Sequence, residues 1–322
     1  MNGAFAHLTV FSNDPASESE ISRSLPAEWQ WFVVYLLVAL IVLWAVLSFA
    51  IARYSVVRRS PPYLEKLPEA DQKVFTEHRL ITDDGQTIGS WYAEGLPGCP
   101  VVVLVHGNQN DRSQCLPYAR LFNELGCGTL LITMRTHGDS SGTVNDFGYG
   151  ARQDVIAAVK FLRQRAAGRP ILLFGISAGA TAVSFAAREL GNQVVGVVME
   201  EPFLNIMTAV DRRTKLMLPW GLSHIAYAGL YAAARIVLPH FPMISPVNAV
   251  TGIPQSVPIW ILAGGKDTKA LPEEAQAIYQ KASSHADLVV FPEATHESLL
   301  EHDPARYREL ARKWVATVSI SV

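Results

Sequence analysis

The chain has 322 residues, of which 49% are apolar and 17% are charged. This excludes a disordered or collagen-like chain and predicts one large domain of catalytic size with an appendage. The formal net charge of −2 leaves no basic excess with which to hold nucleic acid. Cys99, Cys115 and Cys127 are too few and too irregularly spaced for a disulfide framework or a zinc site, and they indicate thiols in a reducing compartment.

The first expected element is a single membrane span at residues 29–52. This stretch carries no formal charge and, at about 1.5 Å per residue, is long enough to cross a hydrocarbon core of about 30 Å. Its residues are apolar on every side, and Trp29, Trp31 and Tyr54 stand at its edges, which favours a bilayer over a protein interior. The leader, residues 1–28, is acidic and lacks the basic start of a cleaved signal peptide, so we expect the span to be retained.

The charges on the two sides of the span predict its orientation. Only Arg23 is basic before it, whereas several basic residues follow: Arg53, Arg58, Arg59 and Lys66. The positive-inside rule therefore predicts that the N-terminus is outside and that the catalytic domain is cytoplasmic. Residues 53–73 contain two consecutive prolines and mixed charges, which is typical of a short, stiff tether that keeps the domain close to the membrane.

Residues 74–322 are expected to form the catalytic domain, in which predicted strands and helices alternate. The expected strands are Val74–Ile81, Ile88–Glu94, Pro100–Val105, Thr129–Met134, Ile171–Phe174, Val194–Met199, Val257–Ala263 and Asp287–Phe291. The expected helices are Leu116–Leu125, Ala151–Arg165, Ala178–Leu190, Pro272–Ala282 and Pro304–Val318. Two opening strands followed by βα units predict an α/β fold with a mostly parallel, doubly wound sheet of about eight strands and an antiparallel start.

One interval, residues 202–254, breaks this alternation. It is apolar and cationic, and rich in Ala, Leu and Pro. Its stretch Met217–Leu238 could be taken for a second span, but a proline, a glycine, a histidine and an arginine interrupt it. We therefore expect a lid of helices over the carboxyl edge of the sheet. The alternative is that these helices only pack against the sheet and do not contact substrate.

A nucleophile elbow is predicted at Ser177, in Gly175-Ile176-Ser177-Ala178-Gly179, between an apolar strand and a helix-forming stretch. The backbone of such a turn doubles back and lifts the hydroxyl above the sheet, so it needs small neighbours. The bare pattern arises by chance on the order of once in several chains of this length, and Gly138–Gly142 also matches it. That copy lies in a polar loop without a following helix, so its Ser140 is expected to be structural.

A serine hydroxyl is a poor nucleophile unless a base takes its proton, so the fold must bring a histidine close to it. His296 follows the last predicted strand, at the edge of the sheet where Ser177 is expected. His302, one turn later, is the runner-up. His296 is therefore the expected base.

A carboxylate must hold the imidazole in one tautomer. Asp267, just past the preceding strand, has the expected place and chain order. The alternative is that Asp267 is only a turn residue that follows two glycines and has no catalytic role. Glu200 and Glu201, which follow another strand, remain alternatives for the acid.

Two backbone N–H groups must stabilise the oxyanion of the tetrahedral intermediate. One is expected from Ala178, the residue after the nucleophile, and the other from the loop that follows the strand at Pro100–Val105. In that loop Asn108 is the preferred donor and Gln109 is next, whereas His106 is expected to brace the loop. The sequence implies no metal and no cofactor.

In this order and spacing, the segments HGN, MRTHGDSSG, GISAG, AGGKD and ATH resemble the α/β-hydrolase superfamily, especially its serine-aminopeptidase-like and Bem46-like membrane-anchored branch. The resemblance covers about residues 75–320. It implies these roles: Ser177 as nucleophile, His296 as base, Asp267 as acid, and the Asn108 and Ala178 amides as oxyanion hole. That branch often has Arg-Gly-x-Gly where this chain has Arg135-Thr136-His137-Gly138, and this departure leaves the role of His137 open.

We therefore expect a membrane-tethered serine hydrolase that cleaves an acyl ester. A lipid-like substrate is favoured because a tethered domain meets amphiphiles at high local concentration. Esterases, lipases, thioesterases and peptidases share these motifs, so peptide or acyl-protein thioester hydrolysis is the second hypothesis. A non-catalytic scaffold that recruits partners is the third, although a candidate for every catalytic residue is present. The sequence does not determine the oligomeric state.

Overall fold

The computed structural model describes residues 26–296 and 298–320, so the expectations for the leader up to residue 25 lie outside the described residues. The chain divides between Trp44 and Ala45 into two compact units. The expected span falls within helix α1 (Ala27–Val56), which is 30 residues long. In the described part of the chain, α1 is the one helix long and apolar enough to cross a membrane. Its side chains from Trp29 to Trp44 are all exposed, which is typical of a surface that lipid covers.

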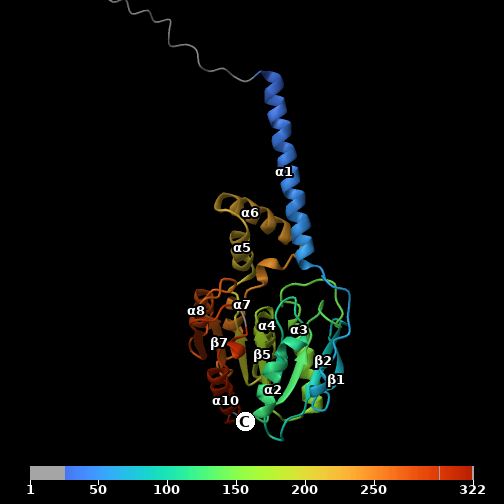
Figure 1. Ribbon diagram of the computed structural model, residues 1–322, viewed down its shortest axis with the longest axis vertical. Coiled ribbons are helices and arrows are strands. Elements are labelled where there is room, and N and C mark those ends of the chain that lie inside the picture. Colours follow the sequence, from blue (N-terminus) through green and yellow to red (C-terminus); the bar gives the residue numbers. More distant parts are fainter. Residues whose placement is uncertain (1–25, 297, 321–322) are drawn as a thin grey trace, which may run out of the picture. The chain divides into compact units, whose positions relative to one another are not determined.

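The second unit is built on one eight-stranded sheet with the strand order β1-β2-β4-β3-β5-β6-β7-β8 (Figure 1). Its strands are β1 (Thr76–Ile81), β2 (Thr87–Ala93), β3 (Val101–Val105), β4 (Gly128–Ile132), β5 (Ile171–Ile176), β6 (Gly196–Glu200), β7 (Ile259–Gly264) and β8 (Ala286–Phe291). The β1–β2 and β2–β4 pairs are antiparallel and all the others are parallel. The predicted fold class is therefore confirmed.

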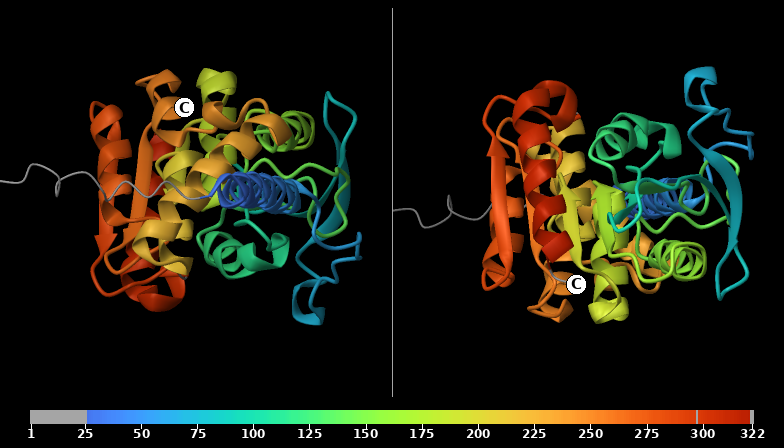
Figure 2. Two further views of the ribbon diagram at one scale, coloured as in Figure 1. Left: turned by 90° about the horizontal axis from the view of Figure 1, so that it is seen from above. Right: turned by 90° about the horizontal axis from the view of Figure 1, so that it is seen from below.

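Helices cover both faces of this sheet (Figure 2). One face carries α3 (Arg152–Arg165), α4 (Ala178–Leu190) and α8 (Pro272–Lys281), and the other carries α2 (Leu116–Glu124) and α10 (Pro304–Ile320). Side chains alternate along a strand, so Val103 of β3 belongs to the core under α3 and α4, whereas Leu104 belongs to the core under α2 and α10. Because β3 to β7 are buried on both faces, the sequences of these strands are nearly continuous apolar runs.

The interval at residues 202–254 forms a helical insertion. Its helices are α5 (Ile206–Met217), α6 (Trp220–Val237) and α7 (Pro246–Ala249). The Asn205 side chain caps α5 by accepting the Thr208 N–H, and Pro219 precedes the first residue of α6. The remaining short helices are α9 (Leu299–His302), η1 (Glu69–Asp71), η2 (Arg112–Cys115), η3 (Gly191–Gln193), η4 (Phe241–Met243) and η5 (Val250–Gly252).

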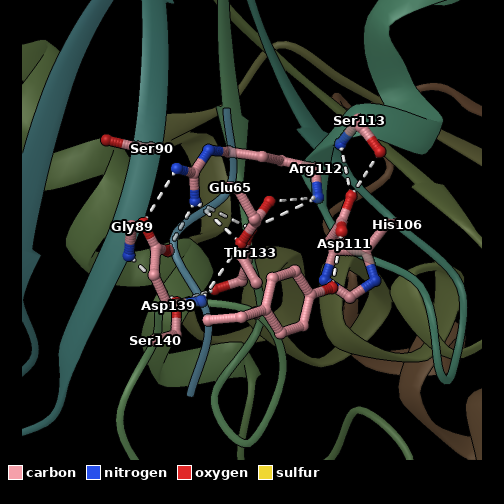
Figure 3. A network of polar contacts seen from close by, with 12 residues as sticks. Glu65, Gly89, Ser90, His106, Asp111, Arg112, Ser113, Thr133, Asp139 and Ser140 are labelled. Atoms are coloured by element: carbon pink, nitrogen blue, oxygen red, sulfur yellow. Dashed lines mark hydrogen bonds and ion pairs between the residues drawn. The ribbon is translucent and has the colours of Figure 1, made fainter. Parts of the chain in front are cut away.

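The segment that follows α1, expected as a tether, is fixed on the catalytic unit. Val57 forms an isolated antiparallel bridge with Val144. Glu65 enters a buried polar network in which it accepts hydrogen bonds from Arg112 Nη1 (3.0 Å) and Thr133 Oγ1 (2.7 Å), as Figure 3 shows. Arg112 also donates to both carboxylate oxygens of Asp139, at 2.6 and 3.0 Å. Burial raises the pKa of Glu65 to about 7, while the Arg112 charge acts in the opposite sense.

Candidate active site

Ser177 lies in the turn between β5 and α4 with φ 53° and ψ −108°. This left-handed conformation is rare for a residue with a side chain and is typical of a functional turn. A Cβ on Gly175 would overlap the Gly179 carbonyl, and a Cβ on Gly179 would overlap the Val105 carbonyl oxygen. The two glycines of the motif are thus required by the close approach of the β3, β5 and α4 backbones.

We expect Gly179→Ala to destabilise the protein by about 3 kcal/mol or more, because backbone rather than a flexible side chain would have to move. Gly221→Ala is the matched control, since a Cβ at this position of α6 meets nothing within 4 Å. Its effect should stay within about 1 kcal/mol. The midpoint of thermal unfolding of both variants in detergent checks this prediction, and an unchanged midpoint for Gly179→Ala would contradict it.

His296 and Asp267 form a hydrogen-bonded pair. The imidazole Nδ1 lies 2.7 Å from Asp267 Oδ2. The other oxygen of this carboxylate accepts the N–H groups of Lys269 (2.7 Å) and Ala270 (2.9 Å), and the Asp267 side chain is fully buried. A carboxylate held in this way only accepts, so Nδ1 of the imidazole carries the proton and Nε2 is left to take one up.

The two alternative acids have different surroundings. Glu201 is buried, has φ 50°, and its Oε2 lies 3.4 Å from the same His296 Nδ1. Glu200 points to the other face, where its carboxylate accepts the hydroxyls of Tyr118 and Tyr307, both at 2.5 Å. Glu201 thus lies beside His296 as a second carboxylate, whereas Glu200 is held by the two tyrosines. His302, the alternative base, is exposed at the end of α9.

The Glu200 carboxyl gives a prediction for pH. Burial raises its pKa to about 7, above the value of about 4.3 expected in the unfolded chain. Between these values the folded state binds more protons, so this group's contribution to stability falls as pH rises and is fully present only below the unfolded pKa. Glu200→Gln, which mimics the protonated form, should remove this dependence.

We therefore expect the stability of the wild type relative to Glu200→Gln to fall by about 3 kcal/mol between pH 4.5 and pH 7.5. Thermal unfolding midpoints of both proteins across this pH range measure the difference. Parallel curves for the two proteins would show that Glu200 does not titrate in this way.

The loop after β3 is the candidate for the second oxyanion donor. The Gly107 N–H donates to Gln114 Oε1 (2.7 Å), and the Gln109 N–H donates to His137 Nε2 (3.1 Å). The Asn108 N–H has no acceptor within the described residues, and Ala178, as the first residue of α4, has no acceptor inside its own helix. The arrangement therefore favours Asn108 over Gln109 as the partner of Ala178.

Other residues fix this loop in place. Asn145 donates through its side chain to Asn108 Oδ1 (2.8 Å) and through its backbone N–H to the carbonyl of Val56 (2.6 Å), the last residue of α1. Tyr63 donates to the Asp111 carboxylate at 2.6 Å. Sequence reasoning missed these contacts, because single polar residues in loops carry no motif.

Three of the five candidate residues line one cavity of about 690 Å³. Ser177, His296 and Asn108 line it, and the other lining side chains include Gln109, Tyr118, Glu201, Arg213, Lys269 and Glu301. Arg213 comes from α5, so the insertion contributes directly to the cavity. Partial desolvation by the surrounding protein lowers the pKa of this guanidinium, which remains a cation at neutral pH.

Glu201, Asp267 and His296 also form the one described group whose atoms could hold a metal ion, since their ligand atoms lie within 4.8 Å of one another. However, the 2.7 Å between Asp267 and His296 is a hydrogen-bond distance. Two ligands on a tetrahedral zinc, with bonds of about 2.1 Å, would lie about 3.4 Å apart. The geometry therefore fits a hydrogen-bonded pair better than a pair of metal ligands.

Comparison with known proteins identifies the family. The model of the alpha/beta hydrolase family matches residues 102–310. The chain belongs to this family. The resemblance of the HGN, MRTHGDSSG, GISAG, AGGKD and ATH segments to the α/β-hydrolase superfamily is thereby confirmed.

Individual relatives of this alpha/beta hydrolase are distant. The uncharacterized protein Rv2307c of Mycobacterium tuberculosis is 27% identical over 220 residues, which is 67% of this chain and 70% of that protein. The lysophosphatidylserine lipase ABHD12 of Danio rerio is 25% identical over 122 residues, 36% of this chain and 31% of that protein. The solved structure of the Pyrococcus furiosus esterase Pf2001 matches with a TM-score of 0.67 at 20% identity and covers 81% of this chain and 97% of the esterase. This last likeness shows the fold.

The departure from Arg-Gly-x-Gly has a structural counterpart in this alpha/beta hydrolase. Thr136 replaces the glycine and has φ 69°, a strained value for a β-branched residue. His137 accepts the Gln109 N–H, and burial lowers its pKa. His106, whose pKa burial lowers to about 3, accepts the Met134 N–H at Nε2 (3.0 Å) and donates from Nδ1 to the Gly107 carbonyl (2.7 Å). Both neutral histidines thus brace the loop after β3.

Proposed function

We propose that this alpha/beta hydrolase is a membrane-anchored serine hydrolase that cleaves carboxylic esters. Ser177 Oγ attacks the ester carbonyl while its proton passes to His296 Nε2, and Asp267 stabilises the imidazolium. The Asn108 and Ala178 N–H groups stabilise the oxyanion. Collapse of the intermediate releases the alcohol with that proton, and water then hydrolyses the acyl-enzyme by the same route.

The observation that carries this proposal is the cavity lined by both Ser177 and His296, with the base bonded at 2.7 Å to a buried carboxylate. Strain at Ser177 supports it, since a left-handed serine persists only where the surrounding structure imposes it. Ester hydrolysis agrees with the names of two similar proteins, an esterase and a lysophosphatidylserine lipase.

A lipid-like ester is the substrate class that fits best. Helix α1 has the length and apolar composition of a span, and a domain tethered to it meets amphiphiles at high local concentration. The basic residues after the span favour a cytoplasmic catalytic unit and an external N-terminus. A reporter fused to the C-terminus should therefore be active in the cytoplasm, and activity only on the outer side would contradict this orientation.

The proposed activity is tested with full-length protein against acyl esters of increasing chain length, acyl thioesters and aminopeptidase substrates. We expect the esters to have the highest kcat/KM. A preference for acyl thioesters or peptides would show that the same triad serves an acyl-protein thioesterase or a peptidase. Failure of every substrate and of a fluorophosphonate probe would contradict catalysis and favour a scaffold.

A further inference from the structure

The turn between α5 and α6 exposes a cluster of large apolar side chains. We call residues 215–225 the lid tip. Met217 and Trp220 are 81% and 84% exposed. The other exposed apolar residues of the lid tip are Leu216, Leu218, Leu222 and Ile225. A contiguous apolar surface of this kind marks an interaction site in a protein that is otherwise well packed.

Helix α6 has the reverse of the pattern expected for a helix that faces water. It buries small residues, among them Ser223, Gly229 and Ala233, and it turns Trp220 and Ile225 outward. A helix on a water-covered surface buries its large apolar residues and exposes polar ones. The outer face of α6 is therefore built for apolar surroundings.

The location of α5 and α6 indicates what those surroundings are. Val56 belongs to the same core cluster as Ile206 of α5 and Ala234 of α6. It is the last residue of α1 and lies four residues after Ala52, the last residue of the uncharged stretch. Four helical residues correspond to about 6 Å. With α1 as the proposed span, chain connectivity therefore brings the first residue of α5 and the last turn of α6, which share this cluster with Val56, close to the membrane surface.

The composition of the lid tip also fits a bilayer surface. Tryptophan is enriched at the membrane–water interface, and cations beside apolar residues attract anionic headgroups. Arg212 and Lys215 lie on α5 just before the exposed residues, and Lys215 also pairs with Asp211 at 2.6 Å. In Figure 1, the turn between α5 and α6 lies on the side of the insertion away from the sheet.

We propose that the lid tip inserts into the interface of the bilayer that holds α1 and delivers membrane-borne esters to the cavity. This inference rests on the proposed function, because it assigns a route to the same site. Arg213, which lines the cavity, lies one turn before Met217 on α5. The helix thus links the bilayer surface to the cavity.

Depth-dependent quenching of a fluorophore tests the insertion. The full-length protein carries Met217→Cys, and an environment-sensitive fluorophore is attached to this cysteine. Cys99→Ser removes the one native cysteine that is partly exposed, since the other two are buried. The control is Ile81→Cys, an exposed apolar position on β1. The protein is placed in vesicles of phosphatidylcholine and phosphatidylglycerol. For the fluorophore at position 217 we expect blue-shifted emission and quenching by lipids that carry a nitroxide near the headgroup. For the fluorophore at position 81 we expect neither.

Two results would overturn the proposal. Emission at position 217 like that of the fluorophore in water would show that the lid tip faces solvent. The second result is a blue shift that increases with protein density in the vesicles and is not accompanied by quenching by the nitroxide lipids. It would show that a second copy of the chain, and not lipid, covers the lid tip.

A kinetic test separates this inference from the proposed function. In Met217→Ser/Trp220→Ser, turnover of a long-chain ester in vesicles should fall at least tenfold, while turnover of a water-soluble short-chain ester stays unchanged. The control Ile81→Ser should change neither. Unchanged turnover of the vesicle substrate would refute the route through the lid tip. If the wild type cleaves neither ester and is not labelled by a fluorophosphonate probe, the proposed function fails, whereas quenching still tests the insertion.

Discussion

Ser177→Ala should lower kcat for a p-nitrophenyl ester by at least about a thousandfold, because no other hydroxyl occupies the strained turn between β5 and α4. Binding should change little, since the cavity and the oxyanion donors remain. Steady-state kinetics of the full-length protein in detergent measure both effects. Retention of more than about a tenth of the activity would show that another residue is the nucleophile.

Ser140→Ala is the matched control, because Ser140 lies in the second G-x-S-x-G pattern of the chain. Its hydroxyl donates to the Thr133 carbonyl (2.6 Å) and accepts the Gly89 N–H (2.9 Å). Its loss leaves a buried N–H without a partner, which costs about 1–3 kcal/mol. We therefore expect a lower unfolding midpoint with near-normal kcat, the opposite of the Ser177→Ala result.

Asp267→Asn should lower kcat by about a thousandfold or more. The buried Asp267 carboxylate accepts the Nδ1 proton of His296 at 2.7 Å. An amide N–H₂ at this place favours the tautomer with the proton on Nε2, which cannot take up the serine proton. The kcat and its pH profile in the full-length variant check this prediction.

Glu201→Gln gives the comparison for Asp267→Asn. Glu201 Oε2 lies farther from the same nitrogen, at 3.4 Å, so its replacement should lower kcat by only about tenfold. If Glu201→Gln instead abolished activity and Asp267→Asn retained it, Glu201 would be the acid of the triad. The structure thus makes the choice between the two carboxylates a measurable one.

The succession of the central strands along the chain could be predicted from the sequence, because β3 to β7 are buried on both faces of the sheet. Val101–Val105 is an uninterrupted apolar run, which local pattern alone identifies as a central strand. For the insertion, the sequence predicts a lid of helices over the carboxyl edge of the sheet, but it does not predict which faces of those helices are buried. Its helices α5 and α6 carry exposed apolar residues such as Met217 and Trp220, and a pattern that reverses the usual amphipathic rule does not indicate which face is buried.

Motifs predict the candidate catalytic residues but not the contacts that position them. Gly175 and Gly179 are constrained by backbone contacts that any chain with this turn needs, so the turn can be predicted from the G-x-S-x-G pattern. Asn145 positions Asn108 only because residues 37 apart in sequence meet in the fold. Glu65, in the segment expected as a short, stiff tether, is part of a buried network that depends on long-range packing.

The most direct test is to identify the residue that a fluorophosphonate probe modifies. The full-length protein in detergent is treated with the probe, digested, and mapped by mass spectrometry, with a heat-unfolded sample as control. We predict one modified peptide, the one that contains Ser177, and no modification after unfolding. Labelling at Ser140 or elsewhere, or no labelling of protein that is folded and cleaves esters, would contradict a nucleophile at the turn between β5 and α4.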